Sequence, residues 1–409
     1  MKQQYDSYKP SGIDWIGDIP SHWTVLRLKH LIRMKSGDTL SSEQIDPEQG
    51  YYPVFGGNGR RGFYSDFNSY GDYVLIGRQG ALCGNINYAH GKFWATEHAV
   101  VCYPLKDIAL FWLGELLRTM NLNQYNVSAA QPGLAVERIK NLLIPVPPLA
   151  EQETIAAWLD EKCEEIDAAI AKVDREIELI DELKQSEISR VVTRGLNPDA
   201  PLRSSGVDWI GDIPAHWTKC RLKFIGSARN GLTYSPSDVK DSGKLVIRSS
   251  NIQDAKLNYD DCVFVANYPE TLSVNSGDTI ICSRNGSINL IGKSVFIEDD
   301  MDVTFGAFMM RFRPYEHPKY SHYLLSIAIS RYKGLFATTT INQLTADSLG
   351  KMEAVMPPYM EQIQIANYLD KKCAEIDGLK AKLTKKRETL TELRQSIISE
   401  VVTGKRKII

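Results

Sequence analysis

Side chains that can hydrogen-bond to nucleic-acid bases gather in two glycine-rich stretches in the first half of this chain. The stretch GGNGRRGFYSDF contains Asn58, Arg60 and Arg61, and the stretch GDYVLIGRQG ends with Arg78, Gln79 and a glycine. An arginine pairs with guanine through two hydrogen bonds, and an asparagine or glutamine pairs with adenine in the same way. These residue types in glycine loops are therefore candidates for contacts with base edges.

The second half of the chain carries three more stretches of this kind: RSSNIQ, SRNGSIN and ATTTINQLT. The candidate DNA-contacting residues in them are Arg248, Ser250, Asn251, Arg284, Asn285, Thr339 and Asn342. Hydroxyl groups suit contacts with phosphates, whereas amide and guanidinium groups suit contacts with bases. Ordinary polar surface loops have a similar composition, so composition alone leaves both interpretations open.

The charge balance predicts local contacts and no uniformly basic surface. The whole chain has a formal net charge of −2. Residues 25–148 and 219–357 each carry two more basic than acidic side chains. Non-specific binding along DNA depends on many phosphate contacts. Weakly basic regions are better suited to specific contacts in a cleft.

Motifs typical of enzymes are incomplete in this sequence. GNGRRG (57–62) matches the dinucleotide-binding glycine pattern, but the residues after it do not predict the required helix. GSINLIGKS (286–294) has five residues between its glycines, where a phosphate-binding loop has four. There is no HExxH and no CxxC sequence. We therefore expect no catalytic residues, no metal site and no bound cofactor in this chain.

A tryptophan-containing peptide occurs twice: SGIDWIGDIPSHWT (11–24) recurs as SGVDWIGDIPAHWT (205–218). Its tryptophans are Trp15 and Trp23 in the first copy, and Trp209 and Trp217 in the second. Aromatic side chains anchor packed elements and protein interfaces alike. The repeat therefore predicts anchors that either pack inside the molecule or dock partner subunits, and both roles stay open.

A longer block is also repeated: PPLAEQETIAAWLDEKCEEID (147–167) recurs as PPYMEQIQIANYLDKKCAEID (357–377), and each copy predicts the start of a long helix. Apolar residues recur every seven positions, with Leu159 and Ile166 in the first helix and Leu369 and Ile376 in the second. Such a seam is typical of a coiled coil. Residues 149–193 carry a charge of −8 and residues 358–409 carry +4, which favours pairing of one helix with the other over self-pairing of either. A pseudo-two-fold arrangement of the two copies would make this pair antiparallel. The alternative is that each helix packs on its own domain.

The regions between the repeats predict one frame with two different surfaces. The offset between the copies grows from 194 to 210, so the second region has 16 more residues. GDYVLIGRQG (71–80) aligns with GDTIICSRNG (277–286), which matches Arg78 with Arg284 at the end of an apolar strand. Each arginine either contacts DNA or pairs with a nearby aspartate to hold the strand end. The sequence does not decide between these roles.

These patterns predict a mixed α/β fold in which two globular domains are joined by two long antiparallel helices, with an internal pseudo-two-fold duplication. The expected segments are the repeated peptide at 1–24, a globular domain at 25–148, a helix at 149–193, a linker with the second peptide at 194–218, a globular domain at 219–357 and a helix at 358–409.

The sequence also argues against a membrane-spanning protein and against a secreted protein. No stretch approaches the roughly 20 apolar residues of a membrane-spanning helix. The start MKQQYDSYKP lacks the apolar core of a secretory signal. The seven cysteines are scattered and odd in number, which is typical of reduced thiols. We therefore expect a cytoplasmic protein without membrane contacts.

The twin DWIGDIPxHW peptides, the twin PPxxEQxxIAxxLDxKCxEID blocks and the paired GD…R-x-G strands together resemble the DNA-specificity subunit of type I restriction-modification enzymes. The resemblance covers nearly the whole chain. It implies that residues 25–148 and 219–357 are target recognition domains, each reading one half of a bipartite double-stranded DNA target. It also implies that the helix pair sets the spacer between the halves and docks modification subunits.

The same resemblance implies a non-catalytic role for this chain. Methyltransferase subunits would carry S-adenosylmethionine, and restriction subunits would bind ATP and Mg²⁺ for translocation and cleavage. Two alternatives are a coiled-coil scaffold that joins proteins without binding DNA, and a stand-alone methyltransferase or nuclease. The scaffold leaves the divergence at Arg, Asn and Gly loops unexplained. The missing cofactor loop and acidic metal cluster argue against the enzyme.

Overall fold

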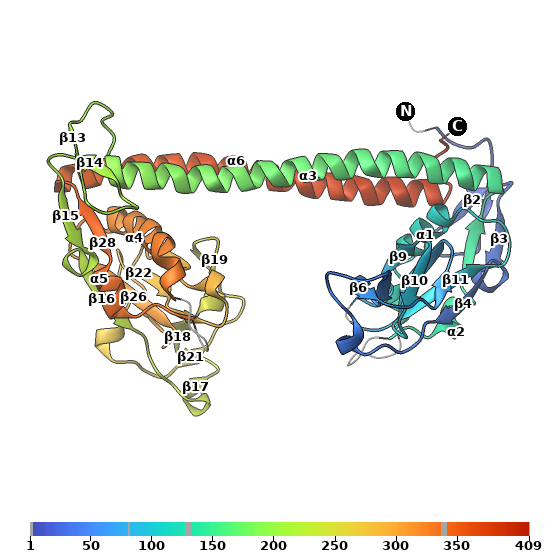
Figure 1. The fold of residues 1–409 in the computed structure, drawn as a ribbon, viewed down its shortest axis with the longest axis horizontal. Coiled ribbons are helices and arrows are strands. Elements are labelled where there is room, and N and C mark those ends of the chain that lie inside the picture. The colour runs from blue at the N-terminus through green and yellow to red at the C-terminus, as the bar shows by residue number, and fades with distance from the viewer. Residues whose placement is uncertain (1–2, 81, 127–132, 337–341, 409) are drawn as a thin grey trace. The chain divides into compact units, whose positions relative to one another are not determined.

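The computed structural model describes residues 3–80, 82–126, 133–336 and 342–408 (Figure 1). The chain forms two compact units. Unit 1 contains Met1–Arg175 and Thr384–Ile409, and unit 2 contains Glu176–Leu383. Each unit combines two four-stranded sheets with helices, so the fold is mixed α/β.

The central sheet of unit 1 is antiparallel, with the strand order β4-β11-β8-β9. Its strands are β4 (Ile32–Ser36), β8 (Tyr73–Gly77), β9 (Ile86–Ala89) and β11 (Ala99–Pro104). Successive side chains of a strand face opposite sides. Ile76 and Val100 therefore pack with helix α1 (Leu110–Thr119), whereas Leu75 and Val101 face the second sheet. Burial of both faces explains the continuous apolar run in β8.

The second sheet of unit 1 has the order β6-β5-β10-β7, in which β5 and β10 pair in parallel. Its strands are β5 (Tyr52–Gly56), β6 (Gly59–Tyr64), β7 (Ser69–Tyr70) and β10 (Lys92–Ala95). The remaining elements are β1 (Tyr8–Pro10), β2 (Asp18–Pro20), β3 (Thr24–Arg27), α2 (Val136–Ile139) and β12 (Leu143–Val146). Strand β1 pairs with β2, and β3 pairs with β12.

Unit 2 repeats the central sheet of unit 1 with different residues. Its central antiparallel sheet has the order β16-β26-β22-β24. Ile281 and Met310 belong to the core that includes helix α4 (Pro318–Tyr332), whereas Ile280 and Met309 belong to the core of the second sheet. That sheet has the order β17-β21-β18-β25, and β18 pairs in parallel with β25 as β5 does with β10. The edge strands of the second sheets differ, because β7 pairs with β10 whereas β17 pairs with β21. The shared frame is therefore the central sheet and the parallel strand pair.

The strands of the two sheets of unit 2 are β16 (Gly226–Asn230), β17 (Val239–Lys240), β18 (Lys244–Ile247), β21 (Phe264–Val265), β22 (Thr279–Cys282), β24 (Ser294–Phe296), β25 (Val303–Phe305) and β26 (Met309–Pro314). Its shorter pairs and helix are β13 (Leu202–Ser204), β14 (Asp212–Pro214), β15 (Thr218–Arg221), β19 (Ile252–Gln253), β20 (Lys256–Leu257), β23 (Arg284–Asn285), β27 (Asn342–Gln343), α5 (Ala346–Lys351) and β28 (Glu353–Met356). Strand β13 pairs with β14, and β15 pairs with β28.

The extra length of the second region lies mostly between β18 and β21. Residues 57 and 58 separate β5 from β6, whereas residues 248–263 separate β18 from β21. The longer segment forms a 3-10 turn and the β19–β20 hairpin. At the hairpin tip, Asp254 and Ala255 adopt positive φ angles of 47° and 58°. The additional residues thus enlarge one loop region and leave the order of the central sheet unchanged.

The two long helices are α3 (Leu149–Arg194) and α6 (Tyr359–Val402), and each starts directly after a Pro-Pro pair. Proline fits the start of a helix because it lacks the N–H that would be unpaired there. The second helix is shorter than the predicted 358–409. It ends at Val402 because Gly404 adopts a φ of 73°, and the tail turns so that Lys407 N donates to Gln3 O at 2.9 Å.

Both units contain ion pairs between a segment of α3 and a segment of α6. The pairs are Asp167–Arg394 and Asp174–Arg387 in unit 1, and Asp181–Lys380 and Lys184–Asp377 in unit 2. Residue numbers rise along α3 as they fall along α6. Within each unit, the two segments therefore run antiparallel.

Candidate nucleic-acid interface

In unit 1, three chain segments meet at the end of β8: the β5–β6 turn, the loop after β8 and the turn between β10 and β11. Arg78 N donates to His98 O at 2.8 Å, which links the second segment to the third. Asn85 Nδ2 donates to Asn58 Oδ1 at 2.6 Å, which links the second segment to the first. Two stretches that are about 20 residues apart in sequence thus form one loop cluster.

Close backbone contacts explain the glycines of this cluster. A Cβ atom on Gly77 would lie 1.9 Å from Gly57 O. A Cβ atom on Gly37, directly after β4, would lie 2.0 Å from Ala95 O. Only glycine permits such approaches of one backbone to another. The glycines therefore hold the loops together as well as allowing tight turns.

The predicted polar residues of unit 1 take different places in this cluster. Gln79 is exposed, whereas Arg78 is half-buried and its Nη1 donates to Ser36 Oγ at 3.2 Å. Arg60 and Arg61 are exposed on β6, directly after the β5–β6 turn. With Asn58, five predicted side chains thus lie at or beside the loop cluster, and Arg78 is the one that contacts the central sheet.

In unit 2, the corresponding segments meet at the end of β22. Ser283 N and Arg284 N both donate to Phe308 O, at 2.9 and 3.1 Å. The guanidinium carbon of Arg284 lies 5.6 Å from the centre of the Phe308 ring, which is 57% exposed. An arginine held over an aromatic face keeps its hydrogen-bond donors available at the ring's edge. Arg284 is therefore positioned by both its backbone and its side chain.

Strand pairing places further predicted residues beside Arg284. Strand β23 pairs with β27, with Arg284 opposite Gln343 and Asn285 opposite Asn342. Thr339 lies outside the described residues. The structure thus brings Arg284, Asn285 and the backbone of Asn342 into one place.

A pocket of about 630 Å³ adjoins Phe308. Its lining includes Tyr234, Arg248 and Ser250. Arg248 Nη2 lies 2.7 Å from Asp261 Oδ2, so the charge of this arginine is compensated within the unit. Ser250 is exposed. Two more predicted residues therefore border the same hollow as the aromatic ring that holds Arg284.

Asn251 corrects the predicted set. Its side chain is 1% exposed. Its Oδ1 accepts from Arg248 N at 2.9 Å, and its Nδ2 donates to Asn258 O at 3.1 Å and to Asp261 O at 2.9 Å. A buried amide with these partners stabilises the loop and has no free edge for a base. Asn251 therefore has a structural role.

Hydrogen bonds at the strand ends show which residues of the two units are equivalent. Gly77 N donates to Asn85 O at 2.8 Å, across the loop that joins β8 to β9. Cys282 N donates to Lys293 O at 2.7 Å, across the loop that joins β22 to β24. Gly77 and Cys282 therefore hold the same position in the two sheets.

It follows that Arg78 corresponds to Ser283, and Gln79 to Arg284. The alignment of Arg78 with Arg284 is therefore shifted by one residue. The cause is a length difference, because unit 1 has one more residue than unit 2 between the Gly-Asp turn and the strand end. A shift of one residue in a strand moves a side chain to the opposite face.

The alternative role for the two arginines was an ion pair with an aspartate. Within the described ranges, neither Arg78 nor Arg284 forms such a pair. Asp278 of the second Gly-Asp turn instead accepts from Arg313 Nε at 2.8 Å and from its Nη2 at 2.7 Å. Asp72 of the first turn is exposed. The Gly-Asp aspartates therefore do not hold the two loop arginines.

The repeated tryptophans divide into buried and partly exposed positions. Trp23 is fully buried among residues of α3 and α6 in unit 1, and Trp217 is buried in the same way in unit 2. Trp15 is 40% exposed. Trp209 is partly buried, with its ring centre 6.4 Å from that of Tyr332. The second tryptophan of each peptide is thus an internal anchor, and the first one reaches the surface.

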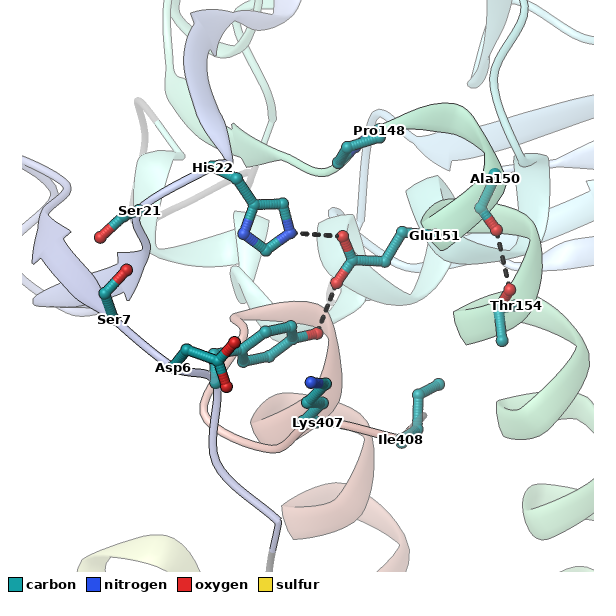
Figure 2. A pocket seen from close by; sticks show the side chains of 11 residues that line it. Asp6, Ser7, Ser21, His22, Pro148, Ala150, Glu151, Thr154, Lys407 and Ile408 are labelled. Carbon is teal, nitrogen blue, oxygen red and sulfur yellow. Dashed lines mark hydrogen bonds and ion pairs between the residues drawn. The ribbon is translucent and has the colours of Figure 1, made fainter.

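A histidine of each repeated peptide contacts a glutamate of the following Pro-Pro block. In unit 1, His22 Nε2 lies 2.8 Å from Glu151 Oε2, and Tyr5 OH donates to Glu151 Oε1 at 2.6 Å. Burial, with the neighbouring Glu151 carboxylate, raises the pKa of Tyr5 above its usual range, so this hydroxyl stays protonated. Figure 2 shows His22 and Glu151 bordering a pocket of about 760 Å³ that Lys407 also lines.

The glutamine after each of these glutamates was missed as a structural residue. Gln152 is buried; its Nε2 donates to Pro147 O at 2.9 Å and its Oε1 accepts from Ala109 N at 3.2 Å. Gln362 makes the equivalent hydrogen bonds at the start of α6. The repeated Glu-Gln pair was the available signal. Each glutamine joins the start of a long helix to the start of a helix of its globular region.

The predicted seam residues are mostly buried. Leu159 is fully buried in unit 1, and Leu369 and Ile376 are buried in unit 2. Ile166 is half-buried. Leu159 and Leu369 belong to the apolar cores of their own units.

The buried thiols are held in their protonated form. Burial raises the pKa of Cys102 to about 12 and that of Cys220 to about 11.

In the part of the chain that the structure describes, no three His, Cys, Asp or Glu side chains form a group that could hold a metal ion. None of the described helices combines the length and apolar composition that crossing a membrane requires.

Two contact residues could not be found from the sequence. His98 directly precedes β11 in unit 1, and Phe308 directly precedes β26 in unit 2. Their carbonyl oxygens accept hydrogen bonds from the N–H groups of the loop that follows the neighbouring strand. Neither belongs to a repeated motif or a glycine-rich stretch. Their importance depends on strand pairing, which composition does not reveal.

Comparison with known proteins identifies the class. The chain matches the family model described as type I restriction modification DNA specificity domain at residues 20–179 and again at residues 214–386. These two segments make up most of the chain. The chain therefore belongs to the type I restriction-modification DNA-specificity family.

Particular relatives agree with this family. The EcoprrI specificity subunit of Escherichia coli is 40% identical over 177 residues, which is 42% of this chain and 44% of that protein. The matches to the StySPI and EcoKI specificity subunits also span 44% of those proteins, so less than half of each of these relatives is covered. The MjaVIII specificity subunit of Methanocaldococcus jannaschii is 22% identical over 428 residues, covering 95% of this chain and 94% of that one.

One solved structure shares the fold over nearly the full length. It comes from work on complex assembly and conformational transition of the type I R-M system. Its TM-score is 0.68 at 18% identity, and the match covers 94% of this chain and 98% of that chain.

Proposed function

We propose that this chain is the sequence-reading subunit of a type I restriction-modification complex. Residues 25–148 and 219–357 act as its target recognition domains, and each binds one half of a bipartite double-stranded DNA target. The observation that carries this proposal is the loop cluster at the end of β8 and its counterpart at the end of β22. In a family of DNA-specificity domains, the same frame presents Gln79 in one unit and Arg284 in the other.

In this proposal the long helices form an antiparallel coiled-coil pair. The pair relates the recognition domains by a pseudo-two-fold axis, sets the spacer between the half-sites and docks methyltransferase subunits. The ion pairs within each unit, such as Asp167–Arg394 and Lys184–Asp377, support the helix pairing. The partly exposed Trp15 supports a docking role for the first tryptophan of each peptide.

The chain contributes no catalysis in this proposal. Methyltransferase subunits bring S-adenosylmethionine, and restriction subunits bind ATP and Mg²⁺. Action on cellular DNA gives the complex a cytoplasmic location. Membership in a DNA-specificity family disfavours the alternative of a scaffold that binds no DNA.

Gel-shift and methylation assays test this function. The chain is mixed with its methyltransferase subunit, S-adenosylmethionine and a library of DNA fragments. We expect methylation only on fragments that share two short sequences at a fixed distance, and only when both proteins are present. Methyl transfer by the chain alone, or assembly without any DNA preference, would contradict the proposal.

A further inference from the structure

The first residue after the strand end is equivalent in the two units. Arg78 and Ser283 are the first residues after the equivalent positions Gly77 and Cys282. Arg78 O accepts from Leu134 N at 2.9 Å, and Ser283 O accepts from Leu344 N at 2.8 Å. The first residue of each loop thus makes the same backbone contact with the segment that follows the helix.

The second residue of each loop is equivalent as well. Gln79 forms an antiparallel bridge with Gly133, and Arg284 forms one with Gln343. These partners directly precede the two leucines that fix the first residue. Gln79 and Arg284 are therefore in register, because each follows an equivalent strand end and pairs with an equivalent segment.

The first residues of the two loops face the protein. Ser283 is 3% exposed and its Oγ donates to Phe308 O at 3.0 Å. Arg78 is half-buried and its Nη1 donates to Ser36 Oγ. Since neighbouring side chains of an extended segment point to opposite sides, the second residues face outward. Gln79 is exposed, and the Arg284 guanidinium lies over the exposed ring of Phe308.

We propose that Gln79 and Arg284 are the matched base-reading residues of the two recognition domains, with Gln79 selecting an adenine and Arg284 a guanine. The side-chain amide pairs with adenine N6 and N7, and the guanidinium pairs with guanine O6 and N7. Arg78 is then a positioning residue that ties its loop to β4. This proposal rests on the proposed function, because it names the bases that the two domains distinguish.

The test exchanges the two chemistries. The full chain with its methyltransferase subunit is assayed on a randomised DNA library, and methylated positions are sequenced. Gln79→Arg should change the preferred base from adenine to guanine at one position of one half-site, by about 10-fold or more. Arg284→Gln should change guanine to adenine at one position of the other half-site. Each variant should leave the remaining half-site unchanged.

Two control variants separate reading from positioning. Gln49→Arg adds the same charge at another exposed position of unit 1 and should leave both half-sites unchanged. Arg78→Ala should weaken binding to all sequences alike and change no base preference. Circular dichroism and complex assembly verify that each variant folds.

The outcomes are distinguishable. If both Gln79→Arg and Arg284→Gln left the half-sites unchanged, this inference would be overturned. A bipartite target of the wild-type complex would still support the proposed function in that case. A base change caused by Arg78→Ala would likewise overturn the inference. A wild-type complex without any sequence preference would remove the proposed function, and this inference with it.

Discussion

His22 Nε2 lies 2.8 Å from Glu151 Oε2, and the same contact recurs in unit 2, where His216 Nε2 lies 2.6 Å from Glu361 Oε1. Each histidine belongs to the repeated tryptophan peptide and each glutamate to the repeated Pro-Pro block. The two motifs therefore meet once in every unit. In each unit, this contact attaches the start of a long helix to the repeated peptide.

Removing the glutamate should loosen this attachment. Glu151→Ala eliminates the acceptor of both Tyr5 OH and His22, which should lower the free energy of unfolding of unit 1 by about 1–2 kcal/mol. Hydrogen exchange of residues 3–30 should speed up. Glu153→Ala, at an exposed position two residues further on, is the matched control. Equal exchange in the two variants would contradict the assigned contact.

The buried tryptophans should respond differently to loss of the indole N–H. Trp217 Nε1 donates to Glu361 Oε2 at 2.9 Å, whereas Trp23 Nε1 has no partner among the described residues. Trp217→Phe should therefore cost about 1 kcal/mol more than Trp23→Phe, beyond the similar loss of packing. Denaturant unfolding followed by hydrogen exchange of each unit measures the difference. A larger cost for Trp23→Phe would refute this explanation.

The buried glutamine of each Glu-Gln pair should be important for stability, because its side chain joins two chain segments. Gln152→Ala leaves Ala109 N and Pro147 O without their partners in a buried place, at a cost of about 2–3 kcal/mol. Gln362→Ala should act in the same way on unit 2. Thermal unfolding measures both variants, with Thr154→Ala as a control at a helix position nearby. Melting temperatures equal to that of the control would argue against the bridging role.

One carboxylate should make unit 2 sensitive to acid. Its hydrogen bonds from Arg190, and also from Tyr368 of α6, hold the pKa of Glu187 at about 2, below its usual value of 4.5. Because the folded pKa is lowered, this stabilisation is present above about pH 4.5 and is lost as the pH falls towards 2. Glu187→Gln should cost about 1 kcal/mol at neutral pH and flatten the pH dependence in that range.

Measuring unfolding from pH 5 to pH 2 tests this prediction. The control is Glu164→Gln, which removes another carboxylate from the surface of α3. A pH dependence that is the same in wild type and Glu187→Gln would show that this carboxylate does not link α3 to α6.

Charge exchange should test the antiparallel register of the helices. Lys184 Nζ lies 2.7 Å from Asp377 Oδ1 in unit 2. Lys184→Asp and Asp377→Lys should each destabilise the unit, and the double exchange should recover about 0.5–1 kcal/mol. A double-mutant cycle on denaturant unfolding gives this coupling energy. Strictly additive effects would mean that the two side chains do not meet in solution.

Much of the frame could be predicted because it depends on local sequence patterns. The Pro-Pro pairs gave the starts of α3 and α6, and the sevenfold spacing identified Leu159 and Leu369 as buried residues. Such features depend on helix geometry alone. The predicted helix ran to residue 409, beyond the end of α6 at Val402. The chain reverses at Gly404, and this reversal depends on contact with the N-terminal segment.

The loop residues were harder to predict because their roles depend on register. Arg78 and Arg284 share a motif, but unit 1 has one extra residue before the strand end. Gln79 is therefore the residue of unit 1 that is equivalent to Arg284 of unit 2. Asn251 has a residue type suited to bases, yet burial commits its amide to the loop. Phe308 belongs to no sequence motif, and its contact with Arg284 depends on how segments distant in sequence pair in the sheet. Residue type suggests chemistry, and pairing decides which atoms remain available.

Mapping the methylated sites of the wild-type complex tests the central claim most directly. Genomic DNA or a random library is methylated by the chain with its methyltransferase subunit, and all modified adenines are located by sequencing. The proposed function, in which the helix pair sets the spacer between two unlike half-sites, predicts two unlike short sequences with one constant gap of unread bases. A single continuous target, a gap of variable length or methylation independent of sequence would contradict the account.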